Sequence, residues 1–395
     1  MMRRRTLAGG GSLLGLGIVW SQAMCVKAKY CHGEAAFAAP KLPTAPPSTE
    51  PTDGTDAGIE TRPQRSRRSQ IVFIGTGSST AVPGAFHLLH PELGSRQSDI
   101  ARLAVATPPE VNRNYRGNTA VVLRVVQDST NGQGREGEEG GTRRRQQVKH
   151  VQIDTGKTWR EGVIRWFPRQ DIYIYLGHSI PGLDGIVLTH DHADAMLGLD
   201  DVRGLQDSKM MTPMPVHLSQ KTDRSVKRVF PYLVGREDDN GAGGRFVAAL
   251  SFKIFQDFEP FEVGGLEVTP FPVLHGEDYV SHGFLFGPHG NKVCYISDVS
   301  RVPPESMSFL RRQGPLQLLV CDALKRTTKH PTHFRVEDSV ILAGELKARR
   351  TLLVGLGSDI EYEETNAMLA AQETQSGAPH VRLAYDGLAV DVDLT

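Results

Sequence analysis

The stretch Leu188-Thr189-His190-Asp191-His192-Ala193-Asp194 directly follows the apolar run 185–188, which has the character of a buried strand. In an extended segment, side chains at alternate positions point to the same side. His190, His192 and Asp194 can therefore converge, and imidazole and carboxylate groups are the expected ligands of zinc and similar transition metals. A polar surface loop is the competing interpretation, but this spacing after a buried strand favours a metal site.

Two further candidate ligands stand at the ends of later strands. His275 follows Pro272-Val273-Leu274, and Asp298 follows the run Val293-Cys294-Tyr295-Ile296-Ser297. A single histidine after a strand is usually structural, and a single aspartate usually caps a turn. The presence of His190 and His192 strengthens their interpretation as metal ligands, so we add both to the predicted metal site.

Around these segments, short apolar strands alternate with helices from residue 71 to the last residue. Helical spacing of apolar residues predicts helices at 157–167, 336–346 and 363–373. No repeat of 20–50 residues is present. The pattern predicts one α/β (α+β) domain of layered sheets over 71–395, with flexible glycine-rich insertions at about 128–147 and 236–245.

The order of these motifs resembles that of the metallo-β-lactamase fold: a strand, Thr-His-x-His-x-Asp, then a histidine, then an aspartate. Within this fold, the chain is most similar to a eukaryotic branch related to the phosphoribosyl 1,2-cyclic phosphate phosphodiesterases. The resemblance covers about residues 70–395 and is carried by the segments 75–79, 115–119, 154–158, 192–195, 198–203, 275–279, 296–301 and 384–387.

The resemblance implies a four-layer αββα sandwich with metal between the edges of its two sheets. His190, His192 and His275 would hold one ion, and Asp194 and Asp298 a second, with Asp298 bridging both. The implied reaction is hydrolysis of a phosphodiester by a metal-bound hydroxide, which Asp194 orients or deprotonates. The expected substrate is a small phosphorylated molecule or a cyclic phosphate.

The segment His330-Pro331-Thr332-His333 resembles a His-x-Thr-His segment of the same branch. We predict that His333 is catalytic, either binding the substrate phosphate or donating a proton to the leaving oxygen, as histidine does near neutral pH. Packing in the loop before the next helix is the alternative for His333 and the favoured interpretation for His330.

Two departures from the family pattern concern the second ion. Ala195 stands where the wider superfamily has a histidine, although the related branch also tends to have alanine there. Ser358 stands where the branch supplies a histidine at the end of a late strand. A serine hydroxyl is a weak ligand, so we expect one Zn²⁺ site and a second site that is weak or absent, with oxygen ligands suited to Mn²⁺ or Mg²⁺. Asp359 and Asp200 are candidate replacement ligands.

Charge limits the class of partner. The 395 residues contain 45 Lys+Arg and 45 Asp+Glu, and this net charge of zero excludes nucleic-acid binding by bulk positive charge. A tRNA 3′-processing nuclease shares the histidine motif and stays an alternative, disfavoured because the long arm that such enzymes use to hold tRNA is not apparent. A catalytically impaired metal-binding protein is the non-enzyme alternative.

Residues 1–70 differ in composition from the rest, with ten basic residues against five acidic ones. Three arginines at 3–5 precede the apolar run 7–20, as in a signal peptide. The motif Ala35-Ala36-Phe37-Ala38-Ala39-Pro40 resembles bipartite plastid presequences, and 41–70 is rich in Pro, Ser, Thr and Arg. We expect a targeting presequence with a disordered linker, plastid import and no membrane association of the mature chain. The secretory pathway and the cytoplasm are the alternative locations.

Overall fold

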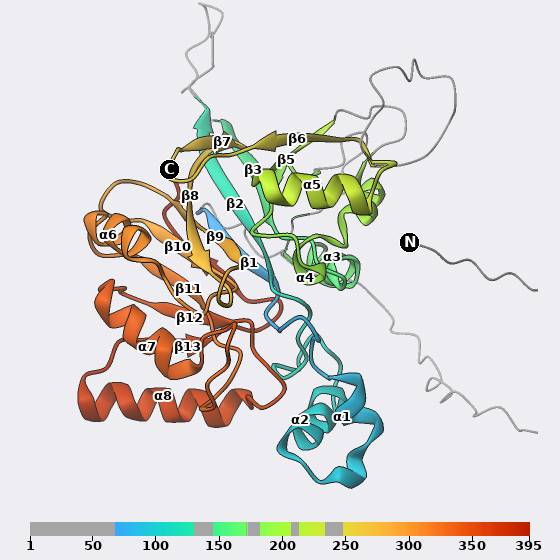
Figure 1. Cartoon of the computed structure of the whole chain (residues 1–395), viewed down its shortest axis with the longest axis vertical. Helices are drawn as coiled ribbons and strands as arrows, with labels where there is room; N and C mark the ends of the chain where they lie inside the picture. Colours follow the sequence, from blue (N-terminus) through green and yellow to red (C-terminus); the bar gives the residue numbers. More distant parts are fainter. Residues whose placement is uncertain (1–67, 130–144, 171, 173–181, 207–212, 234–247) are drawn as a thin grey trace, which may run out of the picture. The chain divides into compact units, whose positions relative to one another are not determined.

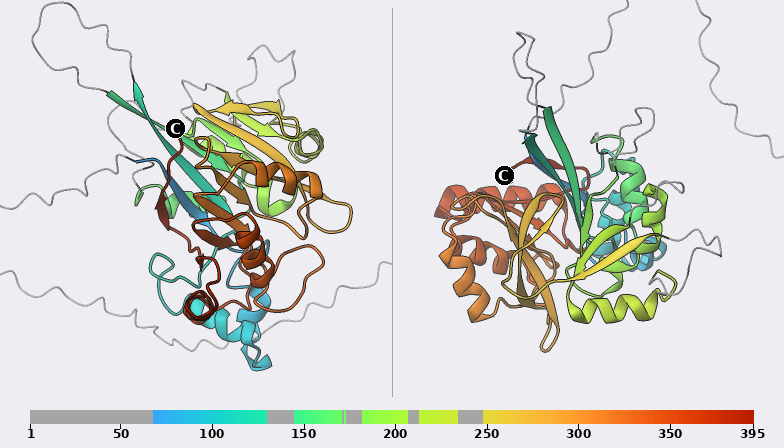
Figure 2. Two further views of the ribbon diagram at one scale, coloured as in Figure 1. Left: turned by 90° about the vertical axis from the view of Figure 1, so that its left-hand side faces the viewer. Right: turned by 90° about the horizontal axis from the view of Figure 1, so that it is seen from above.

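Two seven-stranded sheets stack face to face, and helices cover both outer faces (Figure 1, Figure 2). The computed structural model describes residues 68–129, 145–170, 172, 182–206, 213–233 and 248–395. These residues all belong to one compact unit. The arrangement is the predicted four-layer αββα sandwich of the α/β class.

The first sheet combines an antiparallel half with a parallel half. Its strands, in spatial order, are β14 (Ala389–Asp391), β1 (Gln70–Gly75), β2 (Ala120–Ser129), β3 (Arg145–Ile153), β4 (Gly185–Val187), β5 (Met214–Leu218) and β6 (Leu250–Ile254). The strands β3 to β6 run parallel, so their carboxyl ends meet at one edge of the sheet.

The second sheet is likewise mixed. Its strands, in spatial order, are β13 (Val381–Leu383), β12 (Thr351–Val354), β11 (Leu318–Asp322), β10 (Val293–Ile296), β9 (Val280–Phe286), β8 (Leu266–Leu274) and β7 (Phe261–Val263). The strands β10 to β13 are parallel, and β8 points the same way because β9 lies antiparallel to both β8 and β10. The carboxyl ends of β8, β10 and β11 therefore share one edge.

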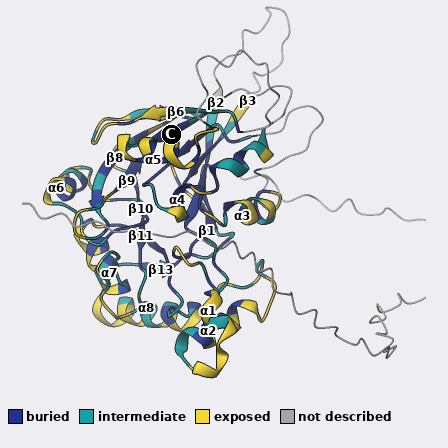
Figure 3. Cartoon of the chain, turned by 45° about the vertical axis from the view of Figure 1, so that its right-hand side comes forward, coloured by how far each residue is buried: buried dark blue, intermediate teal, exposed yellow. Residues whose placement is uncertain are grey.

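Helices shield the outer face of each sheet, so most strands are buried on both faces. The first sheet is covered by α3 (Trp159–Trp166), α4 (Ala193–Met196), the 3₁₀ helix η2 (Leu199–Leu205) and α5 (Gln220–Val229). The second sheet is covered by α6 (Pro304–Arg312), α7 (Val336–Glu345) and α8 (Tyr362–Ser376). Their outward faces are the exposed surface in Figure 3. Between β1 and β2 the chain forms α1 (Ala85–Leu89), η1 (Pro91–Leu93) and α2 (Arg96–Val105).

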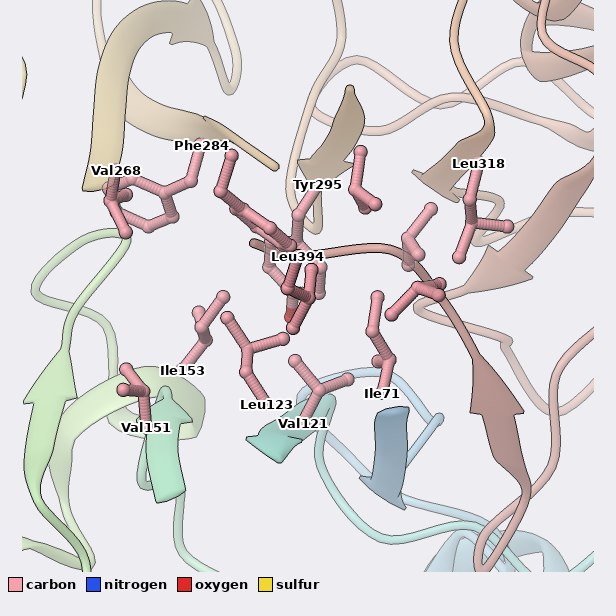
Figure 4. Close-up of a cluster of buried hydrophobic side chains, with 14 of the residues drawn as sticks. Ile71, Val121, Leu123, Val151, Ile153, Val268, Phe284, Tyr295, Leu318 and Leu394 are labelled. Carbon is pink, nitrogen blue, oxygen red and sulfur yellow. The ribbon is translucent and has the colours of Figure 1, made fainter. Parts of the chain in front are cut away.

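One buried apolar cluster fills the space between the sheets (Figure 4). Alternate residues of β2, such as Val121 and Leu123, point into this cluster, whereas Val122 packs toward the helices. This is the period-two pattern of a strand that is buried on both faces. From the opposite sheet, Phe284 and Tyr295 reach the same cluster, and both are 0% exposed.

Two predicted boundaries differ from the structure. Residues 128–129 and 145–147 lie in β2 and β3, whose pairing continues to Ser129 and Arg145, so both ends of the insertion expected at 128–147 are strand. The first strand begins at Gln70, and the buried Ser69 hydroxyl accepts a hydrogen bond from the Val126 amide. The rest of that insertion, the insertion at 236–245 and the leader up to residue 67 lie outside the described residues.

A membrane-crossing helix is not found in the part of the chain that the structure describes, where every helix is too short or too polar for that role.

Candidate metal centre

The candidate site lies where the carboxyl ends of strands from both sheets meet. The strand β4 is fully buried and leads into the loop that carries His190 and His192, and Asp194 follows in the first turn of α4. His275 follows β8, and Asp298 lies just after β10. Ligands from distant parts of the chain thus meet at one edge of the sandwich.

The loop after β3 fixes the histidine loop in place. The Thr155 amide donates to the Ala195 carbonyl at 2.7 Å, and the Gly198 amide donates to the Thr155 carbonyl at 2.7 Å. A Cβ at Gly156 would lie 1.9 Å from the Asp194 carbonyl oxygen, so the two segments touch through their backbones. Only glycine fits at this contact.

Three histidines converge on one point. Ligand atoms of His190, His192 and His275 all lie within 4.8 Å of one another. His190 is 2% exposed, and its Nε2 has no hydrogen-bond partner among the described residues. A buried, unpaired ring nitrogen is unfavourable unless something binds it, and a metal ion suits a set of three imidazoles. The donor set therefore fits the implied ion.

Hydrogen bonds on the far side of two of these rings turn Nε2 toward the common point. The Thr332 carbonyl lies 2.7 Å from His275 Nδ1, which must therefore carry the proton. His190 Nδ1 lies 2.8 Å from the Thr189 hydroxyl oxygen. That hydroxyl donates to Asp154, 2.8 Å from Oδ2, so its oxygen accepts from His190. Such contacts orient metal-binding histidines and select their tautomer.

Burial keeps His190 neutral. It lowers the pKa of His190 to about 3, in spite of the opposing influence of Asp194. A neutral imidazole has the free lone pair that a metal requires. Burial also raises the pKa of Asp154 well above its usual range, although Thr189 donates both its amide and its hydroxyl hydrogen to that carboxylate.

His275 also belongs to a second group of converging ligand atoms, with Asp298 and His333. His333 Nδ1 lies 3.8 Å from Asp298 Oδ1 and 2.8 Å from Asp322 Oδ2. Asp322 ends β11 and is fully buried, and burial raises its pKa to about 7. Although burial opposes it, the charge of Asp322 raises the pKa of His333 to about 9. Asp322 therefore orients His333 as a proton donor beside the ligand cluster.

Asp194 joins neither group of converging ligand atoms. It is half-buried, and burial together with the charge of Asp298 raises its pKa.

The two aspartates considered as replacement ligands for a second ion contact basic residues instead. Asp359 accepts a hydrogen bond from the Arg326 amide and faces Lys325, and Asp200 pairs with Arg203 at 3.2 Å.

Sequence reasoning missed the residues that support the ligands. Asp154 and Asp322 each stand at the carboxyl end of a buried strand, the same position that singled out Asp298. Tyr279, whose ring stacks on His192 at 4.4 Å between centroids, had no such signal. Asp191, which accepts hydrogen bonds from the hydroxyls of Tyr279 and Ser225, likewise had no such signal in the sequence.

Among solved structures, the chain resembles a diphosphatase from the PhnP family, with 28% identity and a TM-score of 0.57 over 83% of this chain and 99% of the other. Zn²⁺-bound PqqB from Methylobacterium extorquens shares the fold, at 18% identity and a TM-score of 0.55 over 82% and 100% of the two chains. Yeast PDE1 shares it at 11% identity and a TM-score of 0.52 over 82% and 99%.

A curated relative named octanoyltransferase, from Porphyromonas gingivalis, is 24% identical over 215 residues, which are 54% of this chain. The match spans only 39% of that protein's length. The family model of the beta-lactamase superfamily domain matches residues 149–355, which include the converging histidines, Asp298 and His333. The chain therefore belongs to the metallo-β-lactamase superfamily, whose members include metal-dependent hydrolases.

Proposed function

We propose that this protein is a metal-dependent phosphodiesterase that hydrolyses small phosphodiesters, with cyclic phosphates as the leading substrate class. The convergence of His190, His192 and His275 around a buried, unpaired ring nitrogen carries the proposal. The neighbouring pair of His333 and Asp322 adds a positioned proton donor. The 28% identical structure from the PhnP family is named a diphosphatase, a name that likewise describes hydrolysis at phosphorus.

His190, His192 and His275 would hold the ion, with Asp298 as a further ligand. When bound, such an ion lowers the pKa of water to generate the nucleophile and neutralises charge on the phosphate. Burial and the charge of Asp298 raise the pKa of Asp194, and in the proposal Asp194 orients or deprotonates the attacking water.

His333 donates the proton to the leaving oxygen in this proposal. Its Nδ1 faces Asp322, so Nε2 is the ring nitrogen left for the substrate. Its ring lies 4.6 Å from that of His275, centroid to centroid. A proton donor beside the ligand cluster can protonate the leaving oxygen as the phosphorus–oxygen bond breaks.

We also propose that one Zn²⁺ is held tightly and that a second ion, Mn²⁺ or Mg²⁺ included, binds weakly or not at all. The two groups of converging ligands share His275, whose Nδ1 is committed to the Thr332 carbonyl, so its Nε2 can serve one ion. Metal analysis of the purified protein tests this proposal, and two tightly held zinc ions per chain would refute it.

Hydrolysis of bis(p-nitrophenyl) phosphate with added Zn²⁺ or Mn²⁺ tests the activity. We expect turnover by the wild type and none by His192→Ala, whereas His289→Ala, at an exposed turn position, keeps wild-type turnover. If His192→Ala is as active as the wild type, the metal mechanism is wrong. If a folded, zinc-loaded wild type hydrolyses no phosphodiester, the protein is a metal-binding relative without this activity.

For localisation, we propose plastid import directed by residues 1–70, on the evidence of the arginine-led apolar run and the motif around Phe37. A fluorescent reporter fused behind these residues should enter the plastid. A cytosolic reporter signal would contradict the proposal.

A further inference from the structure

We propose that the groove between α6 and α7 binds a small carboxylate with an apolar body, of the arylalkanoate class. The groove lies on the outer face of the second sheet, and none of the residues that line it belongs to the candidate metal centre. It is therefore a separate binding site, and it does not depend on the proposed phosphodiesterase function. Three features of the groove support the proposal: its apolar walls, an arginine at its rim and its small volume.

Apolar side chains from both helices form the walls of this groove (Figure 1). Met307 comes from α6 and Leu342 from α7, and both are buried. Val302 and Phe334, which lie shortly before these two helices, extend the walls. Ile341 also lines the groove, although it is 53% exposed. An apolar ligand would cover the exposed part of Ile341, and the burial of this surface favours binding.

Arg301 brings a positive charge to the rim of the groove. Two hydrogen bonds fix its backbone, because the Leu274 amide donates to the Arg301 carbonyl at 2.9 Å and the Arg301 amide donates to the Leu274 carbonyl at 3.2 Å. The residue is exposed, and its guanidinium makes no hydrogen bond or ion pair with any other residue that the structure describes. The guanidinium is therefore available to an anionic ligand in the groove.

The two acidic residues of the groove are already paired with other arginines. Asp338 lies 3.4 Å from the Arg335 guanidinium, and Glu345 lies 2.8 Å from that of Arg311. The charge of Arg301 is therefore the one left for a ligand. A planar carboxylate matches the guanidinium fork with two parallel hydrogen bonds. Its single negative charge is also repelled less by Asp338 and Glu345 than the double charge of a phosphate monoester would be.

The volume of the groove limits the ligand to a small molecule. The groove measures about 280 Å³. Sites for drug-sized ligands usually measure about 300–1,000 Å³, so this one is smaller than they are. A phenyl ring with a short alkyl chain suits this volume, with the ring between the apolar walls and the carboxylate at Arg301. A nucleotide or a folded peptide is too large to be enclosed there.

Three probes test the proposal by ligand-observed NMR titration of zinc-loaded full-length protein. We expect 3-phenylpropanoate to bind with a Kd on the order of 1 mM, as suits a ligand of this size. The uncharged 3-phenylpropan-1-ol and the small anion acetate should each bind about tenfold more weakly or worse, because one lacks the charge and the other the apolar body. An alcohol that binds as tightly as the carboxylate would overturn the proposal.

Two variants with matched controls locate the binding. Arg301→Gln should weaken binding of 3-phenylpropanoate about tenfold, and Ile341→Glu should weaken it further, because it places a negative charge on the apolar wall. The controls are Arg312→Gln, at the exposed end of α6, and Ile164→Glu, at a 58% exposed position of α3. Both controls should bind like the wild type. Wild-type binding by Arg301→Gln would refute the site.

A further variant separates the groove from the metal centre, because carboxylates are also ligands for zinc. His192→Ala should bind 3-phenylpropanoate like the wild type. Binding that is lost in His192→Ala and kept in Arg301→Gln would place the probe on the metal ion and overturn the proposal. Binding at the groove by a protein that hydrolyses no phosphodiester would leave this site in place and refute only the proposed function.

Discussion

The two sheets contribute to the candidate metal centre in different ways. The first sheet supplies His190 and His192 from one short loop, supported from below by Thr189 and the buried Asp154 carboxylate. The second sheet supplies single residues from separate strand ends, namely His275, Asp298 and His333, held by the Thr332 carbonyl and by Asp322. The first half of the site, from the first sheet, is thus one contiguous sequence motif. The residues of the second half, from the second sheet, come together only when the chain folds.

The two halves of the site are expected to have different roles. In the first half the hydrogen bonds of Asp154 and Thr189 lead to His190, so that half should govern how tightly the ion is held. In the second half Asp322 supports His333, which we place at the leaving group, so that half should also govern turnover. Substitutions in the two halves should therefore have separable effects.

The largest effect is expected from His190→Ala in the first half. It removes the buried nitrogen at the centre of the ligand set, so the purified protein should retain no zinc after dialysis and show no turnover. Metal analysis and hydrolysis of bis(p-nitrophenyl) phosphate measure both. His289→Ala, at an exposed position, is the control and should match the wild type. Wild-type zinc content in His190→Ala would show that His190 is not a ligand.

Asp322→Asn should lower turnover and leave the metal in place. The amide has the size of the carboxylate but loses the negative charge that keeps His333 protonated, so kcat should fall by about 10²-fold. Zinc content should equal that of the wild type. Asp391→Asn, at the far edge of the first sheet, is the control for a lost carboxylate. Loss of zinc from Asp322→Asn would contradict the proposed division between the halves.

Thr189→Val should weaken metal binding with little effect on kcat at saturating zinc. Valine has nearly the same shape but cannot link Asp154 to His190, and such supporting contacts contribute about 10–100-fold to metal affinity. Leaving the buried carboxylate with fewer partners should also destabilise the fold by about 1–3 kcal/mol. Competition with a zinc chelator and urea denaturation measure the two effects. Thr328→Val, at an exposed position, should change neither.

The effect expected to be smallest at neutral pH concerns acid stability, which depends on two histidines of the first sheet. Burial lowers the pKa of His150 in β3 and of His217 in β5 to about 4. An unfolded histidine binds a proton below about pH 6.5, so the stability that depends on a neutral His150 is lost as the pH falls from 6.5 to 4.

His150→Gln removes this titration. Urea denaturation between pH 7 and pH 4 should show a shallower loss of stability than in the wild type, by up to about 3 kcal/mol at the acid end. His289→Gln is the control at an exposed position and should keep the wild-type slope. An unchanged slope in His150→Gln would mean that His150 is already protonated in the folded protein.

The sequence by itself determined the fold class and predicted five candidate ligands, of which the structure brings His190, His192 and His275 together and leaves Asp194 apart. The reason is that a strand ending in alternating histidines carries its geometry locally, since the backbone period alone places both rings on one side. His275 and Asp298 were predictable for a related reason, because each follows a short apolar run that the structure shows to be a strand.

Only the tertiary structure decided which groups surround these ligands. Asp322 meets His333, Asp154 meets His190 through Thr189, and Lys221 meets Tyr279 because separate strands end at one edge of the sandwich. It also placed Asp194 outside both groups of converging ligands. Contacts between residues far apart in sequence depend on strand order and on the packing of two sheets, which no local pattern of residues specifies.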